Sequence, residues 1–540
     1  MKKIVLFVIV ILALFLRVYK IASIPPSLSW DEVSIGYNAY SILTTGRDEH
    51  GRLLPFDTFV GYGDYKPPLA IYVTVPFVAA FGLSELSVRL PSALFGALTV
   101  LLTYFLVLEL FRGRRDFALL CALLLSVSPW HINLSRGGFE ANIALFLAVL
   151  GVWFVLKARS SPKYWLVAWL PLVGAIYTFN SSRVFTVLLA PALVLLTWKY
   201  VKKNIRLFIF GIVIATATLA PIVPHLLSPQ ARLRFTEVNI FTDLSVVKKA
   251  NERIAREPGS PIAKIVSNRR VGYAWSFLIH FMDNLQPQFL FVTGDGNPKF
   301  SIQDVGQLYM IEAPFLVIGI IALFAEYPAV AAFLLYWLIA AIIPAATARE
   351  TPHALRILNS LPTWHIFIAF GILSAYKYFA HPMKKWQNRA FIVVLIFFYL
   401  FSVVYYLHTY YRHYPIEYSH EWQYGYREAF AKILPIASKY NDIRITDSIG
   451  RPYMYTLFYT KTKPQDFWNS KKDYFDAAGF YHVDGFMKYS FAGLLPDVLD
   501  PKTLYIWDSG AVPRGARVLD TIYLLNGNPV LTIFDNGSIK

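Results

Sequence analysis

The sequence predicts an α-helical polytopic membrane protein with about 11 transmembrane helices and a C-terminal extracytoplasmic α/β domain. Of its 540 residues, 56% are hydrophobic and only 16% are charged, whereas soluble domains average about 45–50% and about 25%. The 34 Tyr, 42 Phe and 13 Trp residues exclude disordered and fibrous proteins, which contain few aromatic side chains. The third observation is the spacing of apolar segments and basic loops along the chain.

A spanning helix needs about 20 mostly apolar residues, and eleven segments approach this length. The predicted spans are residues 4–20, 88–111, 117–131, 141–157, 164–180, 184–200, 207–226, 311–326, 328–347, 357–376 and 390–408. The third is short, and the eighth and ninth are separated only by a turn at Glu326–Pro328.

Basic residues set the predicted orientation. With a cytoplasmic amino terminus, four of the five internal inner connections contain several Lys or Arg residues, as cytoplasmic loops do. This accounts for the net charge of +17 without nucleic acid as a partner. We therefore expect a multi-pass protein of the cell membrane, with residues 409–540 outside. The single cysteine, Cys121, excludes an internal disulfide and is expected to be a small packing residue.

The outer segments have their own predicted structure. Loops 21–87 and 227–310 are long enough to be structured. In the first, Lys66-Pro67-Pro68 opens an apolar stretch that we expect to form an interfacial or half-buried helix. In the tail, "DIRITDS" and "RVLDTIYLL" alternate in polarity like strands. Residues 4–20 resemble a signal peptide superficially, but Arg17 and the lack of a small-residue cleavage site favour a retained helix.

Asp31 and Glu32 lie about ten residues beyond the first predicted span. A carboxylate at the rim of an apolar cavity suits a general base that activates a hydroxyl. The alternative is structural, because Ser29 and Glu32 have the spacing of a helix capping box. The two interpretations are compatible, since a cap also orients the intervening Asp31.

Other charged residues gather at the predicted outer ends of the spans. Lys66, at a helix amino terminus, is either an anion site or a lysine reaching the interface. Arg136 and Glu140 are four residues apart, a spacing that places both on one side of a helix and favours an ion pair. The remaining candidates for binding phosphate are Arg269, Arg270 and Arg356, with His353 near the last. The alternative for Arg269 and Arg270 is that they are ordinary surface arginines of a long loop. No nucleotide-binding glycine loop or HExxH zinc motif is found in the sequence.

These residues, with "KPPL" and "LSVRLPSALFGALTVLLTYFLV", give the chain a resemblance to a known superfamily. It resembles the C-type (GT-C) membrane glycosyltransferases that include the dolichyl-phosphate-mannose protein mannosyltransferases and the bacterial aminoarabinose transferase for lipid A. The resemblance is strongest over residues 1–200 and does not extend into the tail. It implies that residues 1–408 form a catalytic transmembrane domain. The mixed polarity of residues 409–540 predicts a separate soluble domain.

The resemblance implies a role for each candidate. Asp31 would be the catalytic aspartate, with Glu32 beside it in the catalytic site, and Glu140 would be a second acidic residue of that site. Lys66 and Arg356 would contact the donor phosphate. Arg136, Arg269 and Arg270 are further candidates for that contact. Some relatives have a metal-binding Glu immediately before the lysine. Here that position is Tyr65, so a divalent metal is left open.

The activity implied is transfer of a sugar from a polyprenyl-phosphate donor to a protein, lipid or glycan acceptor on the outer face, with inversion and Asp31 as base. Membrane lipids are the other expected partners. A lipid or glycan transporter is the alternative, although such proteins usually show inverted repeats and ionisable residues at the bilayer midplane. A non-catalytic receptor would leave Asp31 and Lys66 without a role.

Overall fold

The computed structural model describes residues 1–228, 231, 236, 238–380, 385–477 and 479–538. The chain divides into two compact units. The first contains residues 1–17, 94–135 and 140–407, and the second contains residues 18–93, 136–139 and 408–540. Each unit is described separately below.

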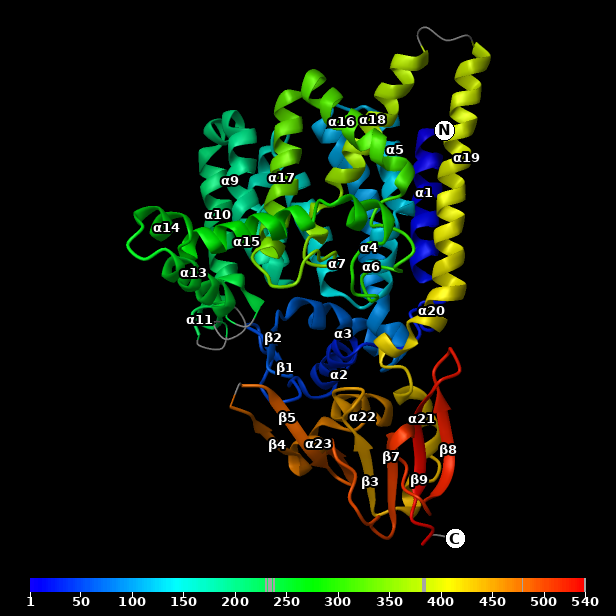
Figure 1. The fold of residues 1–540 in the computed structure, drawn as a ribbon. Coiled ribbons are helices and arrows are strands. Elements are labelled where there is room, and N and C mark those ends of the chain that lie inside the picture. Colours follow the sequence, from blue (N-terminus) through cyan, green and yellow to red (C-terminus); the bar gives the residue numbers. More distant parts are fainter. Residues whose placement is uncertain (229–230, 232–235, 237, 381–384, 478, 539–540) are drawn as a thin grey trace. The chain divides into compact units, whose positions relative to one another are not determined.

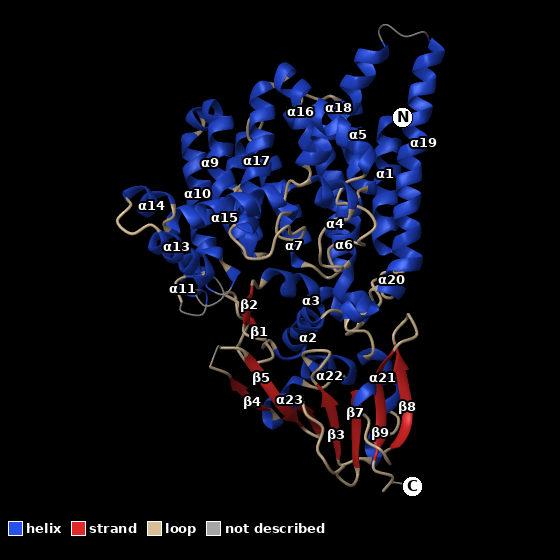
Figure 2. Ribbon diagram, viewed as in Figure 1, coloured by secondary structure: helices blue, strands red, loops and turns tan. Residues whose placement is uncertain are grey.

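The first unit is helical (Figures 1 and 2). Its elements, including those that continue into the second unit, are α1 (Lys2–Val18), α4 (Glu85–Leu110), α5 (Arg115–Val127), α6 (Pro129–Arg136), α7 (Glu140–Lys157), α8 (Leu170–Ile176), α9 (Asn180–Lys203), α10 (Ile205–Leu219), α11 (Val223–Leu226), α13 (Leu244–Arg256), α14 (Pro261–Val266), α15 (Arg269–Asp283), α16 (Ala313–Glu326), α17 (Pro328–Ala346), α18 (Thr363–Ala380) and α19 (Lys385–His408).

The multi-span helical class is confirmed. Among the described residues, seven helices are long and apolar enough to cross a membrane, and eight if the bent pair α5–α6 is one span. Each of the eleven predicted segments contains helix, but α1, α8 and α16 have only 17, 7 and 14 residues. The number eleven therefore stays a prediction.

The bend of 55° between α5 and α6 explains why the third predicted span is short. Ser128 has an extended backbone with ψ of 126° and precedes Pro129. Proline disfavours the α conformation of the residue before it and is favoured at the first helical position. The first helix therefore ends at Val127 and a new one begins at Pro129.

The first part of the second unit forms around the loop of residues 21–87, which was predicted to lie on the outer side. Helix α2 (Trp30–Thr45) is followed by a hairpin of β1 (Phe59–Gly61) and β2 (Asp64–Lys66), and by α3 (Leu69–Phe81). The predicted helix after Pro67-Pro68 is confirmed, and with 13 residues it is shorter than a span. Its interfacial location stays a prediction.

The tail forms a seven-stranded sheet, so the predicted α/β domain is confirmed. The strand order is β4-β5-β6-β3-β7-β9-β8, with β3 parallel to β6 and β7 and the other pairs antiparallel. The strands are β3 (Asp442–Thr446), β4 (Lys472–Phe475), β5 (Tyr481–Phe486), β6 (Tyr489–Ala492), β7 (Thr503–Asp508), β8 (Arg517–Tyr523) and β9 (Pro529–Asp535). The helices are α20 (Tyr414–Glu417), α21 (Tyr426–Ile433), α22 (Pro452–Thr460) and α23 (Pro464–Ser470).

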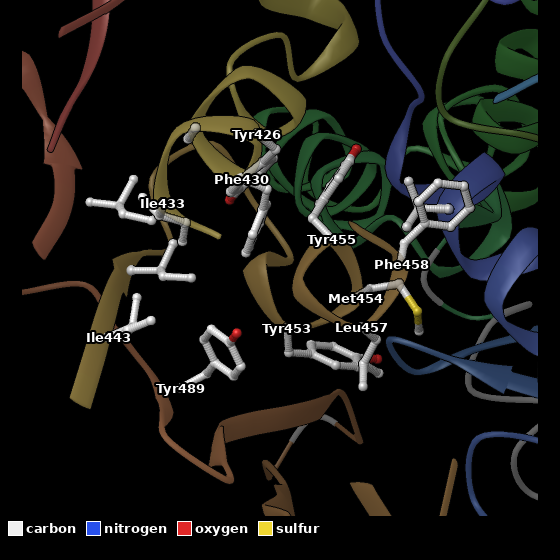
Figure 3. Close-up of a cluster of buried hydrophobic side chains, with 14 of the residues drawn as sticks. Tyr426, Phe430, Ile433, Ile443, Tyr453, Met454, Tyr455, Leu457, Phe458 and Tyr489 are labelled. Carbon is white, nitrogen blue, oxygen red and sulfur yellow. The ribbon is translucent and has the colours of Figure 1, made fainter. Parts of the chain in front are cut away.

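One hydrophobic core joins the tail to the loop of residues 21–87. Side chains of α21 and α22, such as Phe430 and Leu457, pack together over the sheet (Figure 3). Leu28, Val33 and Tyr37 from the start of the chain belong to the same core. The hydroxyl of Tyr37 also donates to the carbonyl of Thr462 at 3.0 Å. Helix α2 is thus held by the tail, while the predicted division into domains at residues 408 and 409 stays a prediction.

Candidate active site at the amino terminus of helix α2

Asp31 and Lys66 form the centre of the candidate site. The Lys66 Nζ atom lies 2.5 Å from Asp31 Oδ1. The Lys66 side chain is 6% exposed, whereas that of Asp31 is 44% exposed. A largely covered ammonium therefore faces a carboxylate that is still accessible. At this site a hydroxyl group can donate to the Asp31 carboxylate, and an anion can bind to the Lys66 ammonium.

Local structure fixes both side chains. Asp31 is in the first turn of α2, where the backbone N–H groups favour negative charge. Lys66 is the last residue of β2, paired with Phe59 of β1. The hydroxyl of Thr58 donates to the Lys66 carbonyl at 3.0 Å. A Cβ atom on Gly61 would lie 3.4 Å from Lys66 Cε, so glycine at this hairpin position leaves room for the lysine stem.

The predicted capping box is present. The Ser29 side chain accepts from the Glu32 N–H group, and Glu32 Oε2 accepts from the Ser29 N–H group at 2.8 Å. Glu32 also accepts from Arg89 Nε at 2.7 Å and from the Gly138 N–H group at 2.8 Å. Glu32 and Arg89 are both 0% exposed. These contacts favour a supporting role for Glu32, which holds the turn that presents Asp31.

Arg136 is also part of the support. It is buried, and its Nη2 atom donates to the carbonyls of Tyr19 and Ile24 at 2.8 and 2.9 Å. Its Nε atom donates to the Tyr410 hydroxyl at 3.2 Å. Contacts with backbone carbonyls and a tyrosine favour a structural role for Arg136 over binding of phosphate.

The predicted placement of Arg136 and Glu140 on one side of a helix is wrong. Helix α6 ends at Arg136 and α7 begins at Glu140. Gly137 and Gly138 between them lose the most conformational freedom in a helix, and the N–H group of Gly138 is used by Glu32 instead of a helical carbonyl. The i, i+4 spacing therefore does not apply.

The other predicted residues belong to the first unit. Glu140 is the half-buried first residue of α7. Arg269 and Arg270 are exposed at the start of α15, after the cap Asn268. Arg356 has its Nη2 atom 3.8 Å from Glu350 Oε2. Because each unit stands by itself, the roles of these four residues stay predictions.

The loop that contains Arg356 is held by Asp295, which was not among the predicted site residues. Asp295 is buried, and its Oδ2 atom accepts from the Ala354 N–H group at 2.6 Å. Its Oδ1 atom accepts from the Asn297 N–H group at 2.8 Å. Burial raises the pKa of Asp295 to about 6, against the lowering effect of these two N–H donors. Burial and the neighbouring Arg356 lower the pKa of His353.

Arg89 was also absent from the predicted site residues. The signal was present, because an arginine in an apolar segment needs an anionic partner or polar surroundings, and "VRLPS" puts one near the start of a predicted span. Nothing in the local sequence identifies Glu32 as that partner.

The described residues contain no group of three or more His, Cys, Asp or Glu side chains arranged to hold a metal ion. At the position where some relatives have a metal-binding Glu, Tyr65 lies in the middle of β2. Among the described side chains, those around Asp31 and Lys66 do not form a metal-ligand set.

The amino-terminal part of the chain matches a family of known proteins. Residues 7–230, less than half of the chain, match the family described as dolichyl-phosphate-mannose-protein mannosyltransferase. Two Bacillus subtilis proteins, YkcB and YycA, both described as candidate mannosyltransferases, are 28% and 29% identical over 158 and 154 residues. These matches cover 29% and 28% of this chain and 22% of each relative.

Two solved structures share the architecture. ArnT from Cupriavidus metallidurans in the apo state has a TM-score of 0.53 at 13% identity, over 99% of this chain and 98% of ArnT. The oligosaccharyltransferase of Archaeoglobus fulgidus has a TM-score of 0.50 at 11% identity, over 89% of this chain and 74% of that protein. At such identities the likeness is one of fold.

The protein is thus a multi-span membrane protein in which residues 21–87 form a long structured loop and the tail is strand-rich. Its fold is that of ArnT and of the Archaeoglobus oligosaccharyltransferase, and its residues 7–230 match the mannosyltransferase family, so the predicted resemblance to the GT-C glycosyltransferases is confirmed in fold and over these residues.

Proposed function

We propose that the protein transfers a sugar from a polyprenyl-phosphate donor to an acceptor hydroxyl on the extracytoplasmic side of the membrane. The observation that supports this most is the accessible Asp31 carboxylate held 2.5 Å from the covered Lys66 ammonium. The match of residues 7–230 to a family of mannosyltransferases supports sugar transfer. An ArnT structure of the same fold contains undecaprenyl phosphate (TM-score 0.52, 14% identity), which supports a lipid-phosphate donor.

In the proposed reaction, Asp31 accepts the proton of the acceptor hydroxyl as its oxygen attacks the anomeric carbon. The bond between that carbon and the phosphate oxygen breaks, and polyprenyl phosphate leaves with the bonding electrons. Attack from the side opposite the leaving group inverts the anomeric configuration. Lys66 neutralises the negative charge that grows on the phosphate, which is the largest contribution that such a site makes.

The proposed base needs a fixed position. Glu32 fixes the first turn of α2 through its bonds with Ser29, Arg89 and Gly138. Since a displacement of about 1 Å costs about 10²-fold in rate, this rigid support is part of the proposed catalytic apparatus.

The test uses the full chain in lipid nanodiscs with a panel of radiolabelled polyprenyl-phosphate sugars. We expect transfer or donor hydrolysis by the wild type, and a loss of at least about 10²-fold in Asp31→Asn with donor binding retained. Asp57→Asn is the matched control, because Asp57 lies in the same outer loop and is ion-paired with Arg52 at 2.5 Å. Full activity of Asp31→Asn would overturn the assignment of the base.

A further inference from the structure

A second polar cavity lies within the tail, away from the pair Asp31 and Lys66 in the sequence. Its volume is about 420 Å³, within the range of about 300–1,000 Å³ of ligand pockets. It is lined by the segment after β3, the start of α22, and residues of β4, β5 and β6. Figure 1 shows these elements in the lower part of the view.

The topology places the cavity at a preferred site for ligands. Strands β3 and β6 are adjacent and parallel, and the residues that follow their carboxyl ends, Asp447 and Gly493, both line the cavity. In sheets with parallel strands, ligands bind in the crevice outside these ends. A Cβ atom on Gly493 would lie 3.2 Å from Asp447 Oδ1, so glycine leaves space beside that carboxylate.

An aromatic platform forms one wall. Tyr474 of β4 and His482 of β5 are paired across the strands, with ring centroids 5.2 Å apart and planes inclined by 15°. The Tyr474 residue is 49% exposed. The face of an aromatic ring is electron-rich, and the C–H groups on one face of a pyranose ring are electron-poor. A flat, exposed ring in a polar cavity therefore suits a sugar.

The charged groups of the lining are available to a ligand. Asp447, Asp484 and Arg451 all face the cavity. Among the described residues, none of these three side chains makes a hydrogen bond or an ion pair, and Arg451 stacks on the Tyr62 ring at 4.8 Å. Carboxylates accept from vicinal hydroxyl groups, and a guanidinium donates to a hydroxyl or ring oxygen.

The charge balance selects among ligands. Two carboxylates face one guanidinium, because the nearby His482 is engaged with Asp476 at 3.0 Å. A phosphorylated sugar or a uronic acid would meet like charges, which disfavour binding. An uncharged sugar or an amino sugar would not meet this repulsion.

This cavity is connected to the candidate active site within the second unit. A Cβ atom on Gly450, at the edge of the cavity, would lie 3.3 Å from the Trp30 ring. The Tyr62 hydroxyl, under Arg451, donates to the Trp30 carbonyl at 2.9 Å. Trp30 immediately precedes Asp31, so one wall of the cavity contacts the turn that presents the proposed base.

We infer that this cavity binds an uncharged sugar unit of a glycan, and that the glycan is the acceptor. The first half is a statement about binding alone. The second half rests on the proposed function, because it assigns the bound glycan to the transfer reaction.

The binding test uses the full chain in nanodiscs and saturation-transfer NMR. The probes are uncharged disaccharides of glucose, mannose, galactose and N-acetylglucosamine, with glucuronate-containing disaccharides for comparison. We expect at least one uncharged probe to bind and the glucuronates to bind at least tenfold more weakly. Tyr474→Ala and Asp484→Ala should each weaken binding at least tenfold, whereas Tyr474→Phe keeps the ring and should retain it.

Asp497→Ala is the matched control, since Asp497 is an exposed acid of the same domain outside the lining. Thermal denaturation shows whether each variant is folded. Absence of binding by every uncharged probe, or equal binding by Tyr474→Ala and wild type, would overturn the inference.

Failure of the inference and failure of the proposed function give different results. Asp31→Asn should still bind the disaccharide, because Asp31 does not line the cavity. If the protein binds the disaccharide but transfers no sugar, the cavity is a glycan-binding site and its role as acceptor site is overturned. Sugar transfer with an acceptor Michaelis constant that Tyr474→Ala leaves unchanged would overturn the acceptor site and leave the proposed function standing.

Discussion

Glu32 and Arg89 form an ion pair in which neither side chain is exposed to solvent. The carboxylate accepts from Arg89 Nε at 2.7 Å and from Nη2 at 3.2 Å. The other guanidinium N–H groups donate to the carbonyls of Ile21, Pro25 and Ser27. All five donors of the arginine are thus used, and the pair fixes the chain on both sides of Ser29-Trp30-Asp31.

Removal of Arg89 should be strongly destabilising. In Arg89→Met the Glu32 carboxylate stays buried without its cation, and breaking a buried pair in this way costs about 3–5 kcal/mol. We expect a large fall in Tm or a loss of folded protein in nanodiscs. The comparison is Arg52→Met, which breaks a partly exposed pair with Asp57 and should cost about 0–1 kcal/mol. Equal Tm values for the two variants would contradict this account.

Lys66 should affect the reaction more than the fold. Loss of one preorganised charge at a developing anion costs about 10²–10³-fold in rate, so we expect a fall of that order in kcat/KM of Lys66→Met. Lys66→Arg keeps the charge and should retain part of the activity. The control is Arg47→Met in the same loop, where Arg47 is bonded to the Gly51 carbonyl at 2.8 Å. A stability loss equal to the activity loss would indicate a purely structural lysine.

The sequence predicted those structural features that depend on residues close to one another in the chain. The apolar segments predicted helices, and Ser29 with Glu32 predicted the cap that is present. Asp31 and Lys66 were predicted separately from their residue types. Their contact depends on the β1–β2 hairpin, whose strands of three residues each are too short for a period of two to be recognised.

Long-range pairing was not predictable. Glu32 and Arg89 are separated by 57 positions, and each has an ordinary local alternative as a cap or a residue at a span end. The packing of Tyr37 against the loop at Thr462 joins positions 425 apart. Such contacts depend on close packing of the folded core and on hydrogen-bond partners for its buried polar groups. A single sequence shows neither.

Close packing of α16 and α18 depends on two glycines. A Cβ atom on Gly319 would overlap the Phe367 carbonyl, and one on Gly371 would overlap the Phe315 carbonyl. Small residues at helix interfaces let backbones approach in membranes. Gly319→Ala should therefore destabilise the protein by about 1–3 kcal/mol, seen as a lower Tm. Gly510→Ala is the control, because a Cβ atom there meets nothing within 4 Å. An unchanged Tm in Gly319→Ala would show that the helices separate at no cost.

Asp295 should make stability depend on pH. Burial raises its pKa from 3.8 to about 6, so between these values the folded protein keeps a proton that the unfolded chain has lost. The contribution of Asp295 to the free energy of unfolding is therefore most favourable below about pH 4. It falls as the pH rises to about 6 and is constant above that pH. At 1.36 kcal/mol per pKa unit, the full difference is about 3 kcal/mol.

Comparison with Asp295→Asn isolates this effect, because the other titrating groups are common to both proteins. The amide does not titrate, so the Tm of the variant relative to wild type should rise between pH 4 and 6 and then level off. A difference in Tm that does not change with pH reports the loss of one carboxylate oxygen, which accepts from the N–H group of Ala354 or Asn297 in wild type.

Asp243→Asn is a second comparison and should show the opposite slope. The hydrogen bond from Ser245 lowers the pKa of Asp243, so wild type gains stability from this group as the pH rises. Parallel Tm profiles for wild type and Asp295→Asn would contradict this prediction, because they would mean that the Asp295 carboxyl is ionised at every pH. The two N–H donors and Arg356 would then offset the whole cost of burying its charge.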